Sequence, residues 1–340
     1  MPTRRSLLKV AALAPFMSPL KVSPAALKPA RLKPGDTVGL VCPAAPAYSR
    51  ETVQVTIESL AALGLKTKLS PHFYDRYGYL AGRDADRATD LNGMFADPSV
   101  NLIMAMHGGW GCARLLNLLD YDLIRRNPKL LIGYSDITAL LLGIYAKTGL
   151  TTIHGPEGAA TWNAYTVDWF RRVLIEGETV MLQNPVPKDD TLAQTKDRIT
   201  TLRPGTARGQ LVGGNLTVLC HLIGSPYLPD WRGKILFVED VHEDVYSVDR
   251  MLTHLKLAGI LGQVAGFVFG KCTKCDVGSG SYGSLTLEEV LTEHIGSLTV
   301  PAYAGAMIGH IADKFTVPIG IDAEMNADTG TIRLLESAVE

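Results

Sequence analysis

The sequence predicts an α/β protein in which a mostly parallel sheet flanked by helices precedes a second α/β domain with a β-rich core. Two observations support this prediction. Short apolar runs alternate with helix-like apolar spacings through the first half of the 340 residues, a rhythm typical of parallel sheets covered by helices. A polar stretch with prolines and no periodicity, residues 184–205, then separates that half from further strands and helices. Domains are therefore expected at residues 33–183 and 206–338, joined by this linker.

Strands and helices alternate in the expected first domain. Its strands are apolar along their length, as buried parallel strands are, and span residues 37–41, 100–106, 130–133 and 151–154. Helical patterns occur at residues 49–63, 84–95, 114–119 and 136–147. Ser49 opens the first helix and Gly64 ends it. This order is flavodoxin-like, and sheets of that kind bind ligands at the carboxyl ends of their strands.

The expected second domain begins with the run RGQLVGGN at residues 208–215. Apolar strands are expected at residues 234–239 and 264–270, and the spacing of residues 247–259 between them predicts an amphipathic helix. A short strand is expected from residue 331.

The balance of charged residues argues against nucleic acid as a partner. Lysine plus arginine (33) nearly equals aspartate plus glutamate (34). No basic field favours nucleic acid, and no charge block indicates a solvated tail. Small molecules or peptides are therefore the expected partners.

The N-terminus differs from the rest of the chain. Arg4 and Arg5 precede a short apolar stretch that two prolines interrupt. This pattern predicts a twin-arginine export leader over residues 1–30 and a periplasmic location, with a leader that stays in the cytoplasm as the alternative. The apolar stretch is too short to span a bilayer and no later segment is long enough, so no stable membrane insertion is expected.

The five cysteines are an odd number and do not form a disulfide framework. Cys272 and Cys275 form a CxxC pair, but no second pair completes a zinc site. The pair follows an apolar strand, whereas a thioredoxin-like motif opens a helix. The favoured interpretation is a structural loop, with a disulfide after export as one option.

The stretch KLLIGYSDITALLLG places Ser135 between an apolar strand and an apolar helix. Backbone N–H groups at a helix N-terminus can stabilise a developing oxyanion, and a serine there becomes a nucleophile when a base removes its proton. The motif departs from G-x-S-x-G, because Gly133 holds the first glycine position but Ile137 holds the second. Helix capping by Ser135 is an equally weighted alternative.

The sequence HGGWG follows the preceding apolar run, at residues 107–111. Paired glycines leave backbone N–H groups unobstructed by Cβ atoms, so Gly108 and Gly109 are candidates for a second oxyanion donor. Phosphate-binding and dinucleotide-binding loops need other glycine spacings, which the sequence lacks. A plain turn is the remaining alternative.

The base and the acid must come from elsewhere in the chain. His310 lies in AMIGHIADK, after small residues that indicate a loop entering a site, while His154 ends a strand. Glu239 ends the apolar run KILFVE, where a carboxylate needs a partner. The alternatives are structural roles for the histidines and, for Glu239, an ion pair with Arg250 or Lys234.

Taken as an ordered set, these motifs resemble the LD-carboxypeptidase family of serine peptidases, which includes muramoyl-tetrapeptide carboxypeptidases and microcin-immunity peptidases. The matching segments run from about residue 33 to residue 335 and read AGRDADRATDLNGMFADP, HGGWGCARLL, LIGYSDITALL, HGP, GGNLTVL, GSPYLPDWRGKILFVEDV, VDRMLTHLKLAG and GHIADKFTVPIG. The ordered set is specific, although no single segment is.

The resemblance implies a triad of Ser135 as nucleophile, His310 as general base and Glu239 as the acid that orients the base. It implies oxyanion donors in the backbone N–H groups of Gly109 and Asp136. It also implies a reaction without metal or cofactor, a homodimer, and a triad that crosses the boundary between the domains.

Two positions depart from the family pattern. Many members have arginine where this chain has His107, and an aromatic residue such as tyrosine where it has Trp110. The family picture places both positions at the substrate, so substrate preference is the open part of the resemblance.

The resemblance implies a serine carboxypeptidase that hydrolyses the L,D amide between a diamino acid and the terminal D-alanine of a murein tetrapeptide. A related peptidase or amidase acting on a peptidyl-nucleotide or another acyl amide is the first alternative. A periplasmic protein that binds peptides without cutting them is the second, and the ordered serine, glutamate and histidine matches argue against it.

Overall fold

The computed structural model describes residues 26–186, 192–278 and 283–340. Most of the expected export leader therefore lies outside the described residues. Its last positions belong to the fold, because the N–H of Leu27 donates to the carbonyl of Gly149 at 2.9 Å. The folded part of the chain thus begins before residue 30.

Strands and helices alternate along the described chain. The strands are β1 (Thr37–Val41), β2 (Lys66–Leu69), β3 (Leu102–Ala105), β4 (Leu130–Gly133), β5 (Thr152–His154), β6 (Met181–Gln183), β7 (Thr200–Arg203), β8 (Thr206–Asn215), β9 (Ile235–Val241), β10 (Gly266–Thr273), β11 (Ala302–Ala304), β12 (Val317–Ile319), β13 (Asp322–Asn326) and β14 (Thr331–Leu334). The α-helices are α1 (Arg50–Ala62), α2 (Asp84–Ala96), α3 (Tyr121–Arg126), α4 (Thr138–Thr148), α5 (Ala164–Phe170), α6 (Leu216–His221), α7 (Val245–Leu257) and α8 (Leu287–His294). Other helical turns are η1 (Cys112–Leu115), η2 (Ser135–Ile137) and η3 (Arg171–Ile175).

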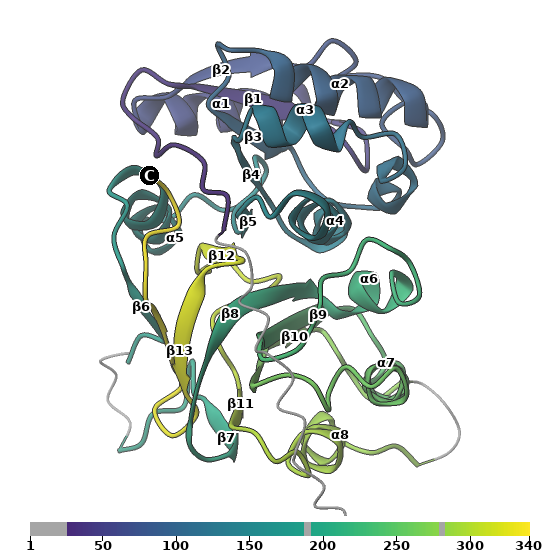
Figure 1. Ribbon diagram of the computed structural model, residues 1–340, viewed down its shortest axis with the longest axis vertical. Helices are drawn as coiled ribbons and strands as arrows, with labels where there is room; N and C mark the ends of the chain where they lie inside the picture. The colour runs from purple at the N-terminus through teal and green to yellow at the C-terminus, as the bar shows by residue number, and fades with distance from the viewer. Residues whose placement is uncertain (1–25, 187–191, 279–282) are drawn as a thin grey trace, which may run out of the picture.

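The first sheet has the strand order β12-β5-β4-β3-β1-β2. Strands β1 to β5 pair in parallel, and β12 is antiparallel to β5. The order β2-β1-β3-β4-β5 is that of flavodoxin-like sheets. Figure 1 shows this sheet with α1, α2 and α3 in the upper half of the molecule. The fold class predicted for this part of the chain is confirmed.

The second sheet has the strand order β6-β14-β13-β8-β9-β10-β11-β7. Its inner strands β8 to β11 pair in parallel, and the flanking pairings are antiparallel. Helices α6, α7 and α8 lie beside this sheet in the lower half of the molecule (Figure 1). The second α/β unit with a β-rich core is therefore confirmed.

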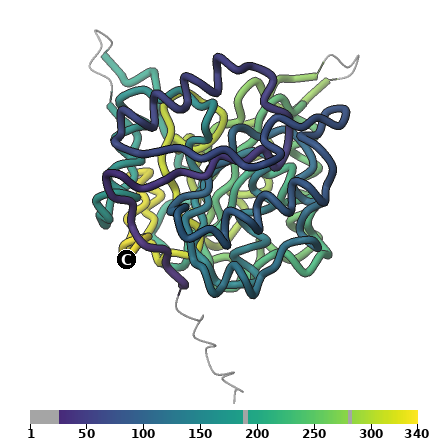
Figure 2. Tube along the Cα trace, turned by 90° about the horizontal axis from the view of Figure 1, so that it is seen from above, coloured from purple at the N-terminus to yellow at the C-terminus, as the bar shows by residue number. Residues whose placement is uncertain are grey.

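Three short strands join sheets that the sequence pattern did not indicate. Strand β6, which was not predicted, falls within the bounds expected for the first domain but pairs with β14 of the second sheet. Strand β7, inside the expected linker at residues 184–205, pairs with β11. Strand β12, also not predicted, falls within the bounds expected for the second domain but extends the first sheet beside β5. Strands of three or four residues carry too little periodicity to reveal their partners. In Figure 2, which views the molecule from above, the N-terminal part of the chain (purple to blue) lies in front of the C-terminal part (green to yellow).

Local capping signals explain where several helices begin. The Oγ of Ser49 accepts the N–H of Thr52 at 3.1 Å and caps α1, as predicted. The expected helix at residues 114–119 is wrong, because only the single turn η1 forms there. Asp120 ends that segment by capping α3, with its carboxylate accepting the N–H of Leu123 at 2.8 Å.

The CxxC pair lies at the end of β10, where Cys272 is opposite Asp240 of β9. Cys272 and Cys275 form a disulfide, one of the arrangements that the sequence left open. The other three cysteines are free and buried, namely Cys42, Cys112 and Cys220.

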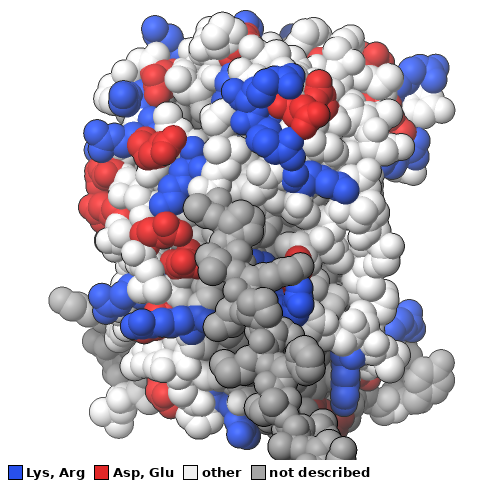
Figure 3. Space-filling model, in the orientation of Figure 1, with Lys and Arg blue, Asp and Glu red and all other residues white. Residues whose placement is uncertain are grey.

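The surface carries mixed charge. Basic and acidic side chains are interspersed over the face shown in Figure 3, in keeping with the formal net charge of −1. Among the helices of the described residues, none is both long and apolar enough to cross a bilayer.

Candidate active site

Ser135 is the first residue of η2, at the turn between β4 and α4. Its φ angle is 60°, a left-handed conformation that is uncommon for residues other than glycine. The capping alternative is not observed, because Tyr134 and Ile137 hold the N-cap positions of η2 and α4. Within the described residues, the Ser135 hydroxyl makes no hydrogen bond. The turn has the strained strand-to-helix form of a nucleophile elbow.

The HGGWG loop packs against this turn and requires its two glycines. A Cβ atom on Gly108 would lie 2.8 Å from the Cβ of Ser135, and one on Gly109 would lie 2.6 Å from the Cβ of Ala45. Gly109 also has a φ of 133°, which favours glycine. In the described part of the chain, the backbone N–H groups of Gly109 and Asp136 make no hydrogen bond. Both are therefore free to donate to a ligand.

The side chain of Asp136 has a structural contact of its own. Its Oδ2 accepts the N–H of Cys112 at 2.8 Å, and burial raises the pKa of this carboxyl group. The bond links η1 to η2 and so holds the segment after the HGGWG loop next to the serine turn.

Glu239 lies near the end of β9 and is fully buried. Its Oε2 is 2.8 Å from Nδ1 of His310, and since a carboxylate only accepts, the ring N–H is the donor. Its Oε1 accepts Nδ2 of Asn215 at 3.3 Å. The histidine and glutamate expected to act together are thus hydrogen-bonded.

The alternative ion pairs for Glu239 do not form among the described residues. Lys234 donates to Oε1 of Gln210 at 2.6 Å, and the guanidinium of Arg250 stacks over the ring of Tyr246 at 5.3 Å. Neither cation is near enough to Glu239 to form a salt bridge.

His310 lies in the loop between β11 and β12, and α5 holds this loop in place. Nδ2 of Asn163, the N-cap residue of α5, donates to Oδ1 of Asp313 at 2.6 Å. The hydroxyl of Thr166 donates to the carbonyl of Ala312 at 2.9 Å. Side chains of the first half of the chain therefore fix the position of a histidine from the second half.

Tyr134 connects the histidine to the serine turn. Its ring meets the ring of His310 edge-on, with 4.9 Å between the ring centroids, and it immediately precedes Ser135. No hydrogen bond joins Ser135 to His310 within the described residues. Such bonds are often long before a substrate is bound, so this geometry is compatible with a nucleophile and its base.

Three further ionisable residues lie buried beside this arrangement, namely His154, Glu157 and Lys314. Burial lowers the pKa of His154 to about 3. Burial raises the pKa of Glu157 to about 8, opposed by the charge of Lys314 and by the backbone N–H of Gly108. The ammonium of Lys314 lies 4.2 Å from the centroid of the Tyr134 ring, and burial lowers its pKa.

Sequence reasoning missed Glu157 and Lys314. Glu157 follows the carboxyl end of β5, and Lys314 stands four residues after His310 in the segment GHIADK. The position after a parallel strand is a signal that could have indicated Glu157. Lys314 carries no such signal, because only the fold brings its loop to Tyr134.

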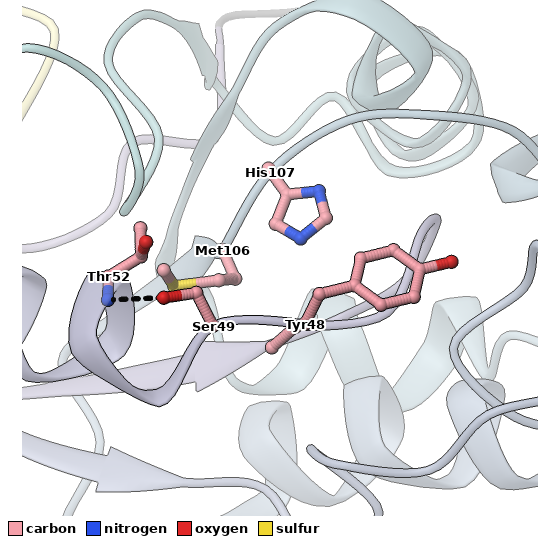
Figure 4. A pocket seen from close by; sticks show the side chains of 6 residues that line it. Tyr48, Ser49, Thr52, Met106 and His107 are labelled. Atoms are coloured by element: carbon pink, nitrogen blue, oxygen red, sulfur yellow. Dashed lines mark hydrogen bonds between the residues drawn. The ribbon is translucent and has the colours of Figure 1, made fainter.

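His107 lines a pocket between the HGGWG loop and the segment that leads into α1. The pocket has a volume of about 280 Å³ and is lined by Ala47, Tyr48, Ser49, Thr52, Met106 and His107. Figure 4 shows the ring of His107 above that of Tyr48, with Ser49 hydrogen-bonded to Thr52. Nε2 of His107 is 2.9 Å from the carbonyl oxygen of Pro46.

Trp110, the other expected substrate contact, does not line this pocket. It is 66% exposed and meets the ring of Tyr79 edge-on at 6.2 Å. The described residues hold no group of three or more histidine, cysteine, aspartate or glutamate side chains placed to bind a metal ion.

Family models match both halves of the chain. The model described as the LD-carboxypeptidase N-terminal domain matches residues 38–155, and the model of the LD-carboxypeptidase C-terminal domain matches residues 208–325. Ser135 lies in the first matched segment, Glu239 and His310 in the second.

Individual proteins agree with this match. The probable murein peptide carboxypeptidase of Bacillus subtilis is 39% identical over 297 residues, covering 86% of this chain and 89% of that protein. The murein tetrapeptide carboxypeptidase of Pseudomonas aeruginosa is 30% identical over 302 residues, covering 86% and 93%. A solved structure of the microcin C7 self-immunity protein MccF, in complex with aspartyl sulfamoyl adenosine, has a TM-score of 0.83 at 30% identity, covering 92% and 100%. The resemblance seen in the sequence is therefore confirmed, and the chain belongs to the LD-carboxypeptidase family of peptidases.

Proposed function

We propose that the protein is a serine-type LD-carboxypeptidase that hydrolyses the L,D amide between a diamino acid and the terminal D-alanine of a murein tetrapeptide. The observation that carries this proposal is the 2.8 Å contact between buried Glu239 and His310, placed against the residue that precedes Ser135. The names of the relatives supply the substrate class, and the residues of the site supply the chemistry.

The hydrogen bond to Glu239 defines the role of His310. With Nδ1–H donated to the carboxylate, Nε2 is left as the basic nitrogen of the neutral ring. This nitrogen takes the proton of Ser135 as Oγ attacks the amide carbonyl, and Glu239 stabilises the imidazolium that forms. His310 then gives the proton to the departing amine of D-alanine, and a water molecule releases the acyl group by the reverse sequence of proton transfers.

Two free backbone donors complete the proposed site. As the carbonyl oxygen becomes negative, the N–H groups of Gly109 and Asp136 donate to it. Gly108 leaves space between them, since a side chain there would meet Ser135. The side chain of Ser135 faces this space, because a Cβ atom on Gly108 would also lie 3.1 Å from its Oγ.

A second activity has a specific observation in its favour. The likeness to MccF extends over 92% of this chain, and that protein has been solved with an aminoacyl sulfamoyl nucleoside. Hydrolysis of a peptidyl-nucleotide or another acyl amide would use the same serine, histidine and glutamate. The two activities differ only in the leaving group and the acyl side.

The deciding measurement is D-alanine release from a muramyl tetrapeptide by the wild-type protein and by Ser135→Ala. We expect release by the wild type and a loss of about 10⁴-fold or more in kcat for the variant, because removing a serine nucleophile has that effect. The variant should keep the wild-type circular dichroism spectrum. Turnover by Ser135→Ala at the wild-type rate contradicts the assignment of the nucleophile.

Release of aminoacyl groups from a sulfamoyl nucleoside, measured in parallel, separates the two activities. Activity on that compound alone would contradict the murein assignment and retain the triad.

We also propose export by the twin-arginine route to the periplasm and a homodimeric state. The disulfide between Cys272 and Cys275 supports an oxidising compartment. Fractionation of cells that produce the full-length chain tests the location, and light scattering of the purified protein tests the dimer.

A further inference from the structure

A buried cation lies beside the candidate nucleophile without a partner. Lys314 is 5% exposed, and its ammonium lies over the ring of Tyr134, the residue before Ser135. Within the described residues, no hydrogen bond or salt bridge involves this ammonium. Burying an unpaired charge is costly, so such a group in a site indicates an absent anionic partner.

Solvent reaches the ammonium of Lys314. The fully buried polar atoms that lack a partner include Oε2 of Glu157 but not Nζ of Lys314. Since Nζ has no partner either, it must retain some access to solvent. The charge is therefore not completely sealed off by protein groups.

The neighbouring carboxyl groups do not form an ion pair with the ammonium of Lys314, so it can bind an anion from a ligand. Glu239 is engaged with His310, and the pKa of Glu157, raised to about 8, keeps that residue mostly protonated near neutral pH. A carboxylate from a ligand would raise the lowered pKa of Lys314 and stabilise its charged form. The surroundings thus favour an anion that arrives with the substrate.

The chemistry of a carboxypeptidase supplies such an anion. The residue that leaves carries a free α-carboxylate, whose carbon lies less than about 4 Å from the carbon of the amide being cut, because only the amide nitrogen and one Cα separate them. A charged donor next to the nucleophile is therefore placed to meet this group. Lysine binds carboxylates as a point charge with three donors.

We propose that Lys314 binds the C-terminal α-carboxylate of the leaving D-amino acid and thereby restricts cleavage to the last residue of the peptide. This inference rests on the proposed carboxypeptidase function. It makes Lys314 a determinant of specificity, distinct from the residues that move protons.

The loop that carries Lys314 is built to hold such a contact. The N–H of Lys314 donates to the hydroxyl of Thr166 at 3.4 Å, and Asp313 accepts from Asn163. The same loop carries His310, so the base and the proposed carboxylate anchor keep a fixed separation. A binding group on a loop that hydrogen bonds hold in place keeps a precise position and so discriminates better between substrates.

The test compares a muramyl tetrapeptide ending in D-alanine with the same peptide ending in D-alaninamide, which lacks the charge. The wild type should prefer the acid in kcat/KM by about 30-fold or more, the lower end of what losing one partner of a buried charge pair costs. Lys314→Met should lower kcat/KM for the acid by a similar factor while leaving the amide nearly unchanged. Lys314→Arg should retain part of the preference.

The matched control is Lys271→Met, at a half-buried lysine whose pKa burial also lowers. This variant should keep the wild-type ratio.

Each outcome decides the proposal. A wild type that cuts both peptides equally well, or a Lys314→Met variant that keeps the wild-type ratio, overturns it. No release of D-alanine or D-alaninamide by the wild type would instead reject the proposed function. Lys314→Met could prove to be folded but inactive on both peptides. In that case calorimetry should measure the affinity of each peptide for Ser135→Ala and for the double variant Ser135→Ala, Lys314→Met. Equal loss of affinity for acid and amide would then contradict the anchor.

Discussion

The serine turn at the first sheet and the acid–base pair at the second sheet are held in different ways. Ser135 adopts a left-handed backbone conformation, is partly exposed, and has a hydroxyl without a hydrogen bond among the described residues. Glu239 is fully buried and accepts hydrogen bonds from His310 and Asn215. One region is positioned by backbone shape and the other by side-chain hydrogen bonds.

This difference predicts different sensitivities. The serine turn depends on clearance, because glycines leave room where any side chain would collide. The acid–base pair depends on a hydrogen bond in a dry environment, where an unmatched group is costly. Substitutions that change volume should therefore damage the first region, and substitutions that change charge should damage the second.

The largest of these effects is expected for Glu239→Gln. The amide is almost the same size but is neutral, so it neither fixes the tautomer of His310 nor stabilises the imidazolium. We expect kcat to fall by about 10³- to 10⁴-fold, as for an asparagine in the place of a triad acid. Glu243→Gln is the matched control, since Glu243 is a partly exposed glutamate whose carboxylate accepts the hydroxyl of Thr217. A larger loss for Glu243→Gln than for Glu239→Gln would show that the wrong carboxylate was chosen.

A smaller effect is expected for Gly108→Ala. Its methyl group would lie 2.8 Å from the Cβ of Ser135, so the loop or the nucleophile must move. A displacement of about 1 Å costs on the order of 10²-fold in rate, which steady-state kinetics measures. The control is Gly93→Ala in α2, where nothing lies within 4 Å of the added methyl group. That variant should be fully active and more stable by about 0.5–1 kcal/mol in urea unfolding. Wild-type kcat/KM for Gly108→Ala would contradict the role of clearance.

The smallest effect on activity is expected for changes at the buried residues Glu157 and His154. Their shifted pKa values should instead change how the stability of the protein depends on pH. The pKa of Glu157 rises from 4.5 to about 8 in the fold, mainly through burial. Between these values the folded state retains a proton that the unfolded chain has lost, so stability falls as pH rises through this window. The pKa of His154, lowered to about 3, acts on the acid side, where stability falls as pH drops below 6.5.

Glu157→Gln isolates the first of these contributions. Its free energy of unfolding, relative to that of the wild type, should increase between pH 5 and pH 8 by up to a few kcal/mol, because the neutral amide does not titrate. Urea unfolding at several pH values measures this difference. Parallel pH curves for the two proteins would mean that Glu157 does not titrate in this range.

Strong local patterns predicted much of the fold. The runs that became β1, β3, β4, β9 and β10 were found because their apolar residues are largely uninterrupted. The edge strands β6, β7 and β12 were not assigned to their sheets, because polar residues or a proline break up each short run and its partner lies far away in the sequence. Pairing across such distances is decided by packing that no local window contains.

The sequence by itself determined the serine turn, because a strand, a glycine, a serine and a helix follow one another within a few residues. It also determined which glutamate and histidine to test, because they stand in motifs that match a family in order. Only the tertiary structure decided that Glu239 and His310, 71 residues apart, share a hydrogen bond. It also decided that the ammonium of Lys314 lies over the ring of Tyr134. The physical reason is that local sequence sets backbone conformation, whereas the burial of a charge and the identity of its neighbours depend on how the two sheets pack together.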